Sequence, residues 1–196
     1  MTHSLHRVGS IDDLKGDYVI LAMLAAGIND KSPDSHQKLV KIAEILNQYN
    51  PTNIMPKTAW KVSPVITAAY TDIKTVKEII KTLKEEDLGV SIVISGLISE
   101  IGEVVKEVGL NMHTVHLSLG TFGKKELLPS EKILEVTTMC GHHCTSPQSV
   151  EYYVDLIKAG KISVKKAAKK LARPCICGIF NITRAIKILS ELANKS

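Results

Sequence analysis

The sequence is poor in large aromatic side chains, with two Phe, one Trp and five Tyr among 196 residues. A core must therefore be built mainly from Ile, Leu, Val and Ala. Apolar residues make up 44% of the chain and charged residues 23%. This balance is typical of a globular protein that can bury a full core.

Long apolar runs are also missing. The longest, Tyr18 to Ile28, has about half of the roughly 20 residues that a transmembrane helix needs. The polar stretch before Asp12 has no apolar segment of the kind found in signal peptides. These features predict a cytoplasmic protein without a membrane partner.

Cysteine is absent outside two tight pairs near the C-terminal end. The pairs stand in the motifs Cys140-Gly-His142-His143-Cys144 and Pro174-Cys175-Ile-Cys177-Gly178. In a reducing compartment, thiols paired this closely are more often metal ligands or redox thiols than structural disulfides. The sequence thus predicts a metal site made by Cys140, Cys144, Cys175 and Cys177, with His142 or His143 as a further ligand or a proton donor.

Four interpretations of these thiols are open. Zinc is usually held by cysteine pairs spaced by two to four residues, which Cys140 and Cys144 satisfy. The tighter spacing of Cys175 and Cys177 favours an iron–sulfur cluster, whose sulfurs the backbone amides of such a loop would stabilise. Redox-active thiols without metal and unrelated buried thiols are the remaining alternatives. We expect an iron–sulfur cluster, with zinc as the alternative.

Short apolar runs alternate with helical patterns over the first two thirds of the chain. Strands are predicted at Tyr18–Leu24, Val62–Ala69, Val90–Leu97 and Thr114–Leu119, the second starting late because of Pro64. Helical patterns follow Ser32-Pro33, Thr71-Asp72 and Ser99, and all of the sequence after Pro129 is predicted to be helical. This order indicates an α/β fold with a mostly parallel sheet and flanking helices, followed by a C-terminal helical module. The expected domains are 1–125 and 126–196.

In a parallel α/β sheet, ligands bind beyond the carboxyl ends of the strands. Asn29, Asp30 and Ser118 stand at such positions and are the predicted contacts of a small-molecule ligand. No segment matches a dinucleotide-binding fingerprint or a P-loop. His113 and His116 would lie on opposite faces of a strand, so they are poor candidates for one metal ion, although one of them could reach the cysteines.

The C-terminal third is basic, with ten Lys or Arg and a single acid, Glu191, from residue 158 onward. This charge suits nucleic acid, an acidic partner protein or an anionic ligand. The last two helical patterns also resemble a helix-turn-helix, but the cysteine segment between them is longer than the usual turn. The recognition helix would carry Asn181, Thr183, Arg184 and Lys187.

The segments Met139-Cys-Gly-His142 and Lys170-Leu-Ala-Arg-Pro-Cys-Ile-Cys-Gly-Ile-Phe-Asn181 resemble a family of archaeal and anaerobic bacterial proteins, over residues 113 to 189. No activity comes with this resemblance. It implies an oxygen-avoiding cytoplasm, in which exposed iron–sulfur clusters are practicable.

Together these features predict an iron–sulfur or other metal-binding protein, acting as a cofactor or small-molecule enzyme or as a maturation factor of anaerobic metabolism. A metal- or redox-sensing DNA-binding regulator and a zinc-stapled interaction module are the alternatives.

Overall fold

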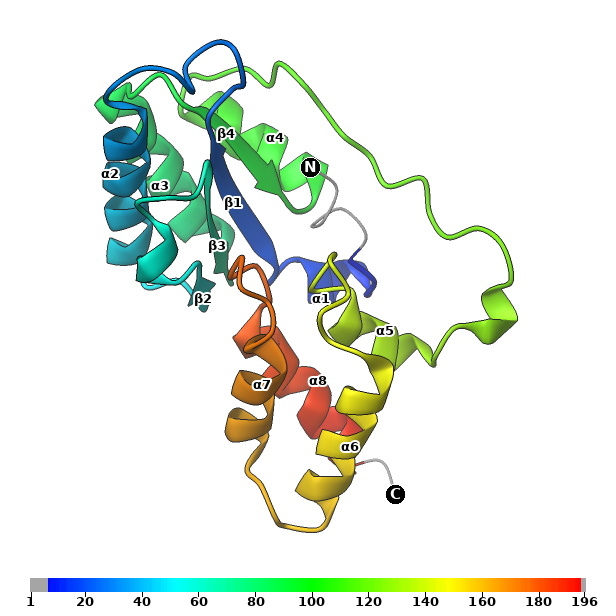
Figure 1. Cartoon of the computed structure of the whole chain (residues 1–196). Coiled ribbons are helices and arrows are strands. Elements are labelled where there is room, and N and C mark those ends of the chain that lie inside the picture. Colours follow the sequence, from blue (N-terminus) through cyan, green and yellow to red (C-terminus); the bar gives the residue numbers. More distant parts are fainter. Residues whose placement is uncertain (1–6, 195–196) are drawn as a thin grey trace.

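Three apolar stretches form the strands that the sequence predicts. A computed structural model describes residues 7–194, with β1 at Tyr18–Met23, β3 at Val65–Tyr70 and β4 at Ser91–Ser95 (Figure 1). Strand β3 begins just after Pro64, which cannot donate to a ladder. A short strand that the sequence did not reveal, β2 at Asn53–Ile54, completes the sheet. The stretch considered for a signal peptide lies largely outside the described residues.

The sheet is antiparallel, so the prediction of a mostly parallel sheet was wrong. Its strand order is β2-β3-β1-β4, and each neighbouring pair is antiparallel. Strands β3 and β4 do run in the same direction, but β1 lies between them. The alternation of strands and helices predicted that successive strands would be neighbours. It did not reveal that the connection from β3 to β4 passes over β1.

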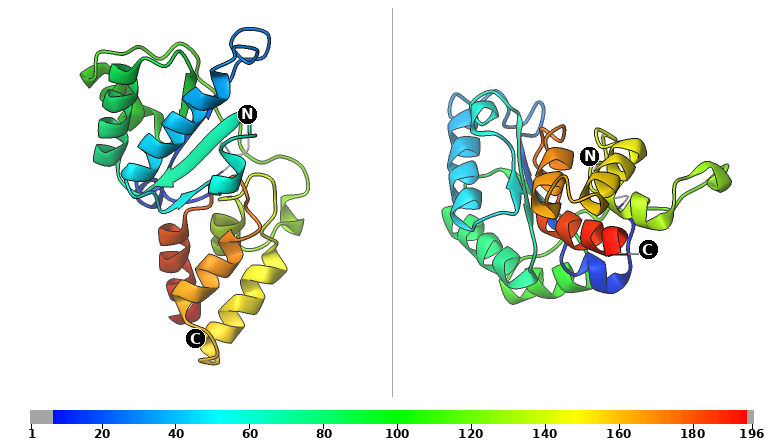
Figure 2. Two further views of the ribbon diagram at one scale, coloured as in Figure 1. Left: turned by 60° about the vertical axis from the view of Figure 1, so that its left-hand side comes forward. Right: turned by 90° about the horizontal axis from the view of Figure 1, so that it is seen from below.

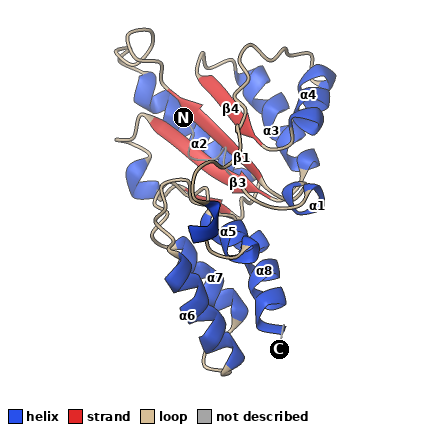
Figure 3. Ribbon diagram, turned by 90° about the vertical axis from the view of Figure 1, so that its right-hand side faces the viewer, coloured by secondary structure: helices blue, strands red, loops and turns tan. Residues whose placement is uncertain are grey.

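The order β1-α2-β2-β3-α3-β4 is that of the ferredoxin-like, or split βαβ, arrangement. Helices α2 (Ser35–Gln48) and α3 (Ile73–Glu86) cover one face of the sheet (Figures 1 and 3). Asp72 caps α3, because its Oδ1 accepts a hydrogen bond from Thr75 N at 2.8 Å. Tyr18, Ile20 and Ala22 of β1 alternate toward these helices and are fully buried.

The predicted strand at Thr114–Leu119 was wrong. Helix α4 (Ile98–Glu107) follows β4, and residues 110–124, here called the connecting segment, then pass the free edge of β4 without forming a strand (Figure 1). Its apolar side chains are largely exposed, with Leu119 82% and Leu117 65% accessible. No described backbone hydrogen bond joins this segment to β4. The alternating apolar residues therefore do not form a strand of the sheet.

The prediction of helices after Pro129 is confirmed. The C-terminal helices are α5 (Glu131–Thr137), α6 (Pro147–Lys158), α7 (Val164–Ala172) and α8 (Ile182–Asn194). Ser146 and Ser163 cap α6 and α7 through hydrogen bonds from Ser149 N and Lys166 N. The remaining short helices are α1 (Ile11–Leu14), η1 (Lys57–Ala59) and η2 (Lys125–Leu127). Within residues 7–194, no helix is long and apolar enough to cross a membrane.

Helices α5–α8 pack below the sheet and meet its second face (Figure 2). Val19 of β1 and Ala69 of β3 point to this side and belong to the core of the helical module. The loop between α7 and α8 packs directly against the sheet. There Gly178 lies so near β2 that an added Cβ would sit 2.2 Å from Ile54 C and from Met55 N.

A buried ionic cluster joins the start of the chain, the entry to β1 and the start of α8. Arg7 Nη1 lies 2.6 Å from both carboxylate oxygens of Asp17, and Arg184 Nη1 lies 2.8 Å from Asp17 Oδ2. Asn181 Nδ2 also donates to Asp17 Oδ1 at 3.0 Å. The three charged side chains are at most 6% exposed. The cluster therefore fixes α8 against the sheet.

Gly178→Ala should strongly destabilise the protein, and Gly160→Ala provides a matched control. Both glycines have φ +67°, but only Gly178 faces backbone atoms, whereas nothing lies within 4 Å of the Gly160 position. We expect Gly160→Ala to cost about 1 kcal/mol for the left-handed conformation and Gly178→Ala at least about 2 kcal/mol more. Urea unfolding measures both, and equal losses would contradict the close packing at β2.

Asp17→Asn should lower the free energy of unfolding by about 3–5 kcal/mol, because two buried guanidinium groups would lose their carboxylate. Asp12→Asn, in the exposed pair with Lys15, is the control and should change it far less. Comparable losses in the two variants would show that Asp17 does not join the two parts.

Candidate functional site

The two cysteine pairs lie on loops at the same end of the helical module. Cys140 follows α5, and Cys175 lies in the loop between α7 and α8. Packing of α6 against α7 brings the loops together. Thr145, next to Cys144, fixes the arrangement by donating from Oγ1 to Leu171 O at 3.0 Å.

The four sulfurs lie close to one another without being bonded. Cys175 Sγ and Cys177 Sγ are 3.7 Å apart, and Cys177 Sγ lies 3.6 Å from His142 Nδ1. Cys140 lies near enough to Cys175 and to Cys144 for these thiols to influence one another's pKa. Cys140 and Cys175 are buried, Cys177 is half-buried and Cys144 is exposed. One side of the cluster is thus closed by protein and the other faces solvent.

Local backbone geometry places these side chains. His143 adopts φ +54° in the turn between the first two cysteines, and its N–H donates to Cys140 O at 2.9 Å. Gly178 N donates to Cys175 O at 3.0 Å, which closes a turn around Cys177. Thr67 of β3 donates to Cys177 O, so the loop is attached to the sheet.

The four thiols differ in acidity. A hydrogen bond with Cys175, followed by burial, raises the pKa of Cys140 well above its usual range. The pKa of Cys177 is lowered, chiefly by a hydrogen bond from Cys175. For Cys175, the hydrogen bond from Cys140 lowers the pKa, but the hydrogen bond with Cys177 and burial outweigh it. Burial, and then the charge of Cys140, raises the pKa of Cys144.

Backbone amides also point at these sulfurs. Hydrogen bonds from Cys144 and His142 lower the pKa of Cys140, and one from Ile179 acts on both Cys175 and Cys177. Amides aimed at sulfur stabilise the thiolate that a metal requires. No three Cys, His, Asp or Glu side chains in the described part of the chain are, however, already arranged as a metal site.

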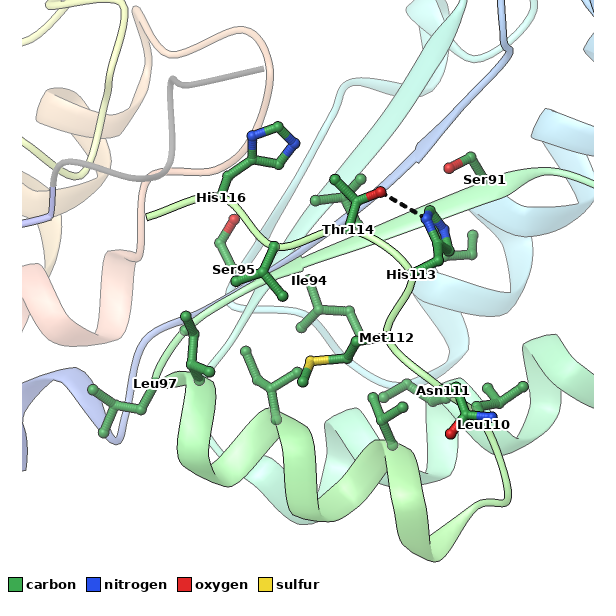
Figure 4. Close-up of a pocket in the computed structure, with 18 of the residues that line it drawn as sticks. Ser91, Ile94, Ser95, Leu97, Leu110, Asn111, Met112, His113, Thr114 and His116 are labelled. Carbon is green, nitrogen blue, oxygen red and sulfur yellow. Dashed lines mark hydrogen bonds between the residues drawn. The ribbon is translucent and has the colours of Figure 1, made fainter. Parts of the chain in front are cut away.

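The three predicted ligand contacts do not come together. Asn29 Oδ1 accepts from Ala25 N at 2.7 Å and Asp30 Oδ1 accepts from Gly27 N at 2.8 Å, so both side chains hold their own loop. Asn29 Nδ2 also donates to Gly89 O, at the start of β4. Ser118 lies beyond His116, which Figure 4 places beside Ser95 at the other end of that strand. These residues are separated because the carboxyl ends of neighbouring strands lie at opposite ends of an antiparallel sheet.

The face proposed to bind DNA is engaged with the rest of the protein. Asn181 and Arg184 are buried in the Asp17 cluster, and Thr183 Oγ1 lies 2.8 Å from Thr52 Oγ1. Lys187 Nζ pairs with Asp13 at 2.6 Å. This side of α8 is therefore not free to enter a DNA groove.

The sequence did not reveal a cavity of about 660 Å³ at the free edge of β4. Strand β4, helix α4 and the connecting segment surround it, and His113, His116 and Ser118 are among its lining residues (Figure 4). The two histidines thus lie at this cavity. Only the tertiary packing creates it, so no motif could have indicated it.

Neither a protein-family model, nor a curated protein, nor a solved structure matches this chain. Its function must therefore be inferred from its own residues.

The thiols of the reduced protein should react with iodoacetamide in a defined order. Cys144 and Cys177 should be modified before Cys140 and Cys175, because burial restricts access to the latter two. The rate at Cys177 should also rise at a lower pH than that at Cys144, since the pKa of Cys177 is lowered and that of Cys144 raised. Quenched alkylation with mass spectrometry measures this, and equal pH profiles would contradict the assigned acidities.

Proposed function

We propose that the chain is a metal-binding protein whose four cysteines hold a thiophilic metal centre between the helical module and the sheet. The candidate ligands are Cys140, Cys144, Cys175, Cys177 and His142, of which a tetrahedral ion would take four. The observation that carries this proposal is the spacing of Cys175, Cys177 and His142.

In a tetrahedral site with metal–sulfur bonds of about 2.3 Å and metal–nitrogen bonds of about 2.0 Å, two sulfurs lie about 3.8 Å apart and a sulfur and a nitrogen about 3.5 Å apart. The measured separations are 3.7 Å for Cys175 and Cys177 and 3.6 Å for Cys177 and His142. Each of the two separations is therefore compatible with two donors of one tetrahedral ion, while the described residues do not yet form a complete metal site. The match favours a single ion, such as zinc, over the iron–sulfur cluster that the sequence led us to expect.

The chemistry of the donors points the same way. The closeness of the thiols makes the simultaneous ionisation of all four unfavourable without a cation, because like charges repel. A bound cation reverses this, since it favours the thiolate form of each ligand. The amides around Cys140 and Cys177 add to the stabilisation of negative sulfur.

Exposure on one side gives the centre a route to solution. His142, His143 and Cys144 are exposed at the same turn, whereas Cys140 and Cys175 are buried. A metal held here would be bound on one side by the buried Cys140 and Cys175 and would be accessible to solvent on the other. This arrangement suits a centre that meets a small molecule or passes a metal to a partner, the enzyme or maturation role, better than a closed structural site.

Metal content of protein purified without oxygen tests the proposal. We expect stoichiometric metal that is lost in Cys175→Ser, with zinc giving colourless protein and tetrahedral cobalt(II) bands after cobalt substitution. Iron with acid-labile sulfide and broad visible absorption would instead establish the cluster. Protein that holds neither, and binds neither zinc nor cobalt when they are added, would overturn the proposal.

The neighbouring histidines provide a matched pair of variants. His142→Ala should weaken zinc affinity by at least about tenfold if the imidazole is a ligand, a loss of about 1.4 kcal/mol. His143→Ala should leave it unchanged, because no described contact joins its side chain to the sulfurs. A competition titration with a chromogenic chelator measures both, and equal affinities would exclude His142 from the centre.

A further inference from the structure

The cavity beside β4 has the size of a small-molecule site. Its volume is about 660 Å³, and ligand pockets usually have about 300–1,000 Å³. It is bounded by the free edge of the sheet, by α4 and by the connecting segment (Figure 4). It is lined by different residues from the cysteine cluster.

Most of the lining is apolar. Ile94 of β4, Ile101 and Val105 of α4 and Met112 of the connecting segment contribute to it. In Figure 4 Met112 points under the connecting segment toward α4. Moving the apolar part of a ligand from water to these side chains would lower the free energy of the complex.

The ionisable side chains in the lining are mostly basic. They are Arg7, Lys84, His113 and His116, and the single acid among the described lining residues is Asp17. Asp17 is already shared by Arg7 and Arg184. This buried trio therefore carries a net charge of +1, and Arg7 and Asp17 are among the residues that line the cavity. An excess of positive charge in a partly desolvated site favours an anion.

The connecting segment provides polar groups at the open side. His113 Nδ1 lies 2.9 Å from Thr114 Oγ1, and Ser91 is close to His113 in Figure 4. Two imidazoles and a hydroxyl on one segment can donate hydrogen bonds to an anionic group while the walls hold an apolar body.

We propose that this cavity binds a small molecule with an apolar body and an anionic group, of the class of aromatic or aliphatic carboxylates and sulfonates. The site goes beyond the metal centre and does not depend on it. The connecting segment forms its outer wall, which explains why apolar side chains stay beside an open sheet edge without pairing with it.

A pair of fluorescent probes tests both parts of the proposal. 8-Anilinonaphthalene-1-sulfonate and N-phenyl-1-naphthylamine share one ring system, and only the first carries an anion. We expect saturable binding of both to the full chain, with the sulfonate at least about tenfold tighter, since a hydrogen bond to a charged group is worth about 1.5–3 kcal/mol.

Met112→Trp should fill the cavity and weaken both probes by about tenfold or more. Phe122→Ala is the control, because Phe122 is an exposed apolar residue of the same segment outside the lining and should change neither affinity. His113→Gln combined with His116→Gln should weaken the sulfonate selectively. These residues lie outside helices and strands, so folding should be preserved, which circular dichroism checks.

Absence of saturable binding would overturn the proposal, as would equal affinity of the probes or the same affinity in Met112→Trp and Phe122→Ala. Metal content is measured on the same samples. Loss of probe binding in protein that keeps its metal would then concern this cavity alone, whereas loss of metal with intact probe binding would concern only the centre.

Discussion

The position of Asp17 determines how the two parts of this protein meet. One buried carboxylate accepts from Arg7 and from Arg184, which are 177 positions apart along the chain. Buried charges are tolerated only when they are paired and hydrogen-bonded. A different position of α8 would leave these charges without their partners and is therefore unfavourable. Arg7 Nη2 also donates to Ile179 O at 2.5 Å, just after the last cysteine. The cluster thus positions both the helical module and the loop that carries Cys175 and Cys177.

Both the loop that carries Cys175 and Cys177 and the cavity lie against the sheet. Alternate residues of β1 face opposite layers, Tyr18 toward α2 and α3 and Val19 toward the helical module. The module approaches so closely that only glycine fits at position 178. Among residues 7–194, in contrast, no further strand pairs with the outer edge of β4, and there the cavity opens. One sheet therefore carries a thiol cluster on a covered face and a ligand-sized cavity at a free edge.

Exposed and buried thiols have different consequences for the proposed centre. The buried sulfurs of Cys140 and Cys175 are fixed by packing, whereas Cys144 and His142 lie on a solvent-facing turn. A centre with such unequal access can keep its metal while part of its coordination sphere changes. The proximity of Cys177 to His142 comes from two loops that lie far apart in the sequence, whereas the amides around each sulfur come from its own loop.

Local features of the sequence determined much of this structure. The apolar runs predicted β1, β3 and β4, caps such as Asp72 marked helix starts, and the two close cysteine pairs predicted one shared site for the four thiols. Each of these depends on neighbours a few residues away. The tertiary structure alone decided that β1 separates β3 from β4, that residues 114–119 form no strand, that Asn29 and Ser118 lie at different ends of β4, and that Arg184 is buried against Asp17. The physical reason is that strand order, edge pairing and charge burial depend on which distant surfaces meet. The free energy of those long-range contacts cannot be read from any local sequence pattern.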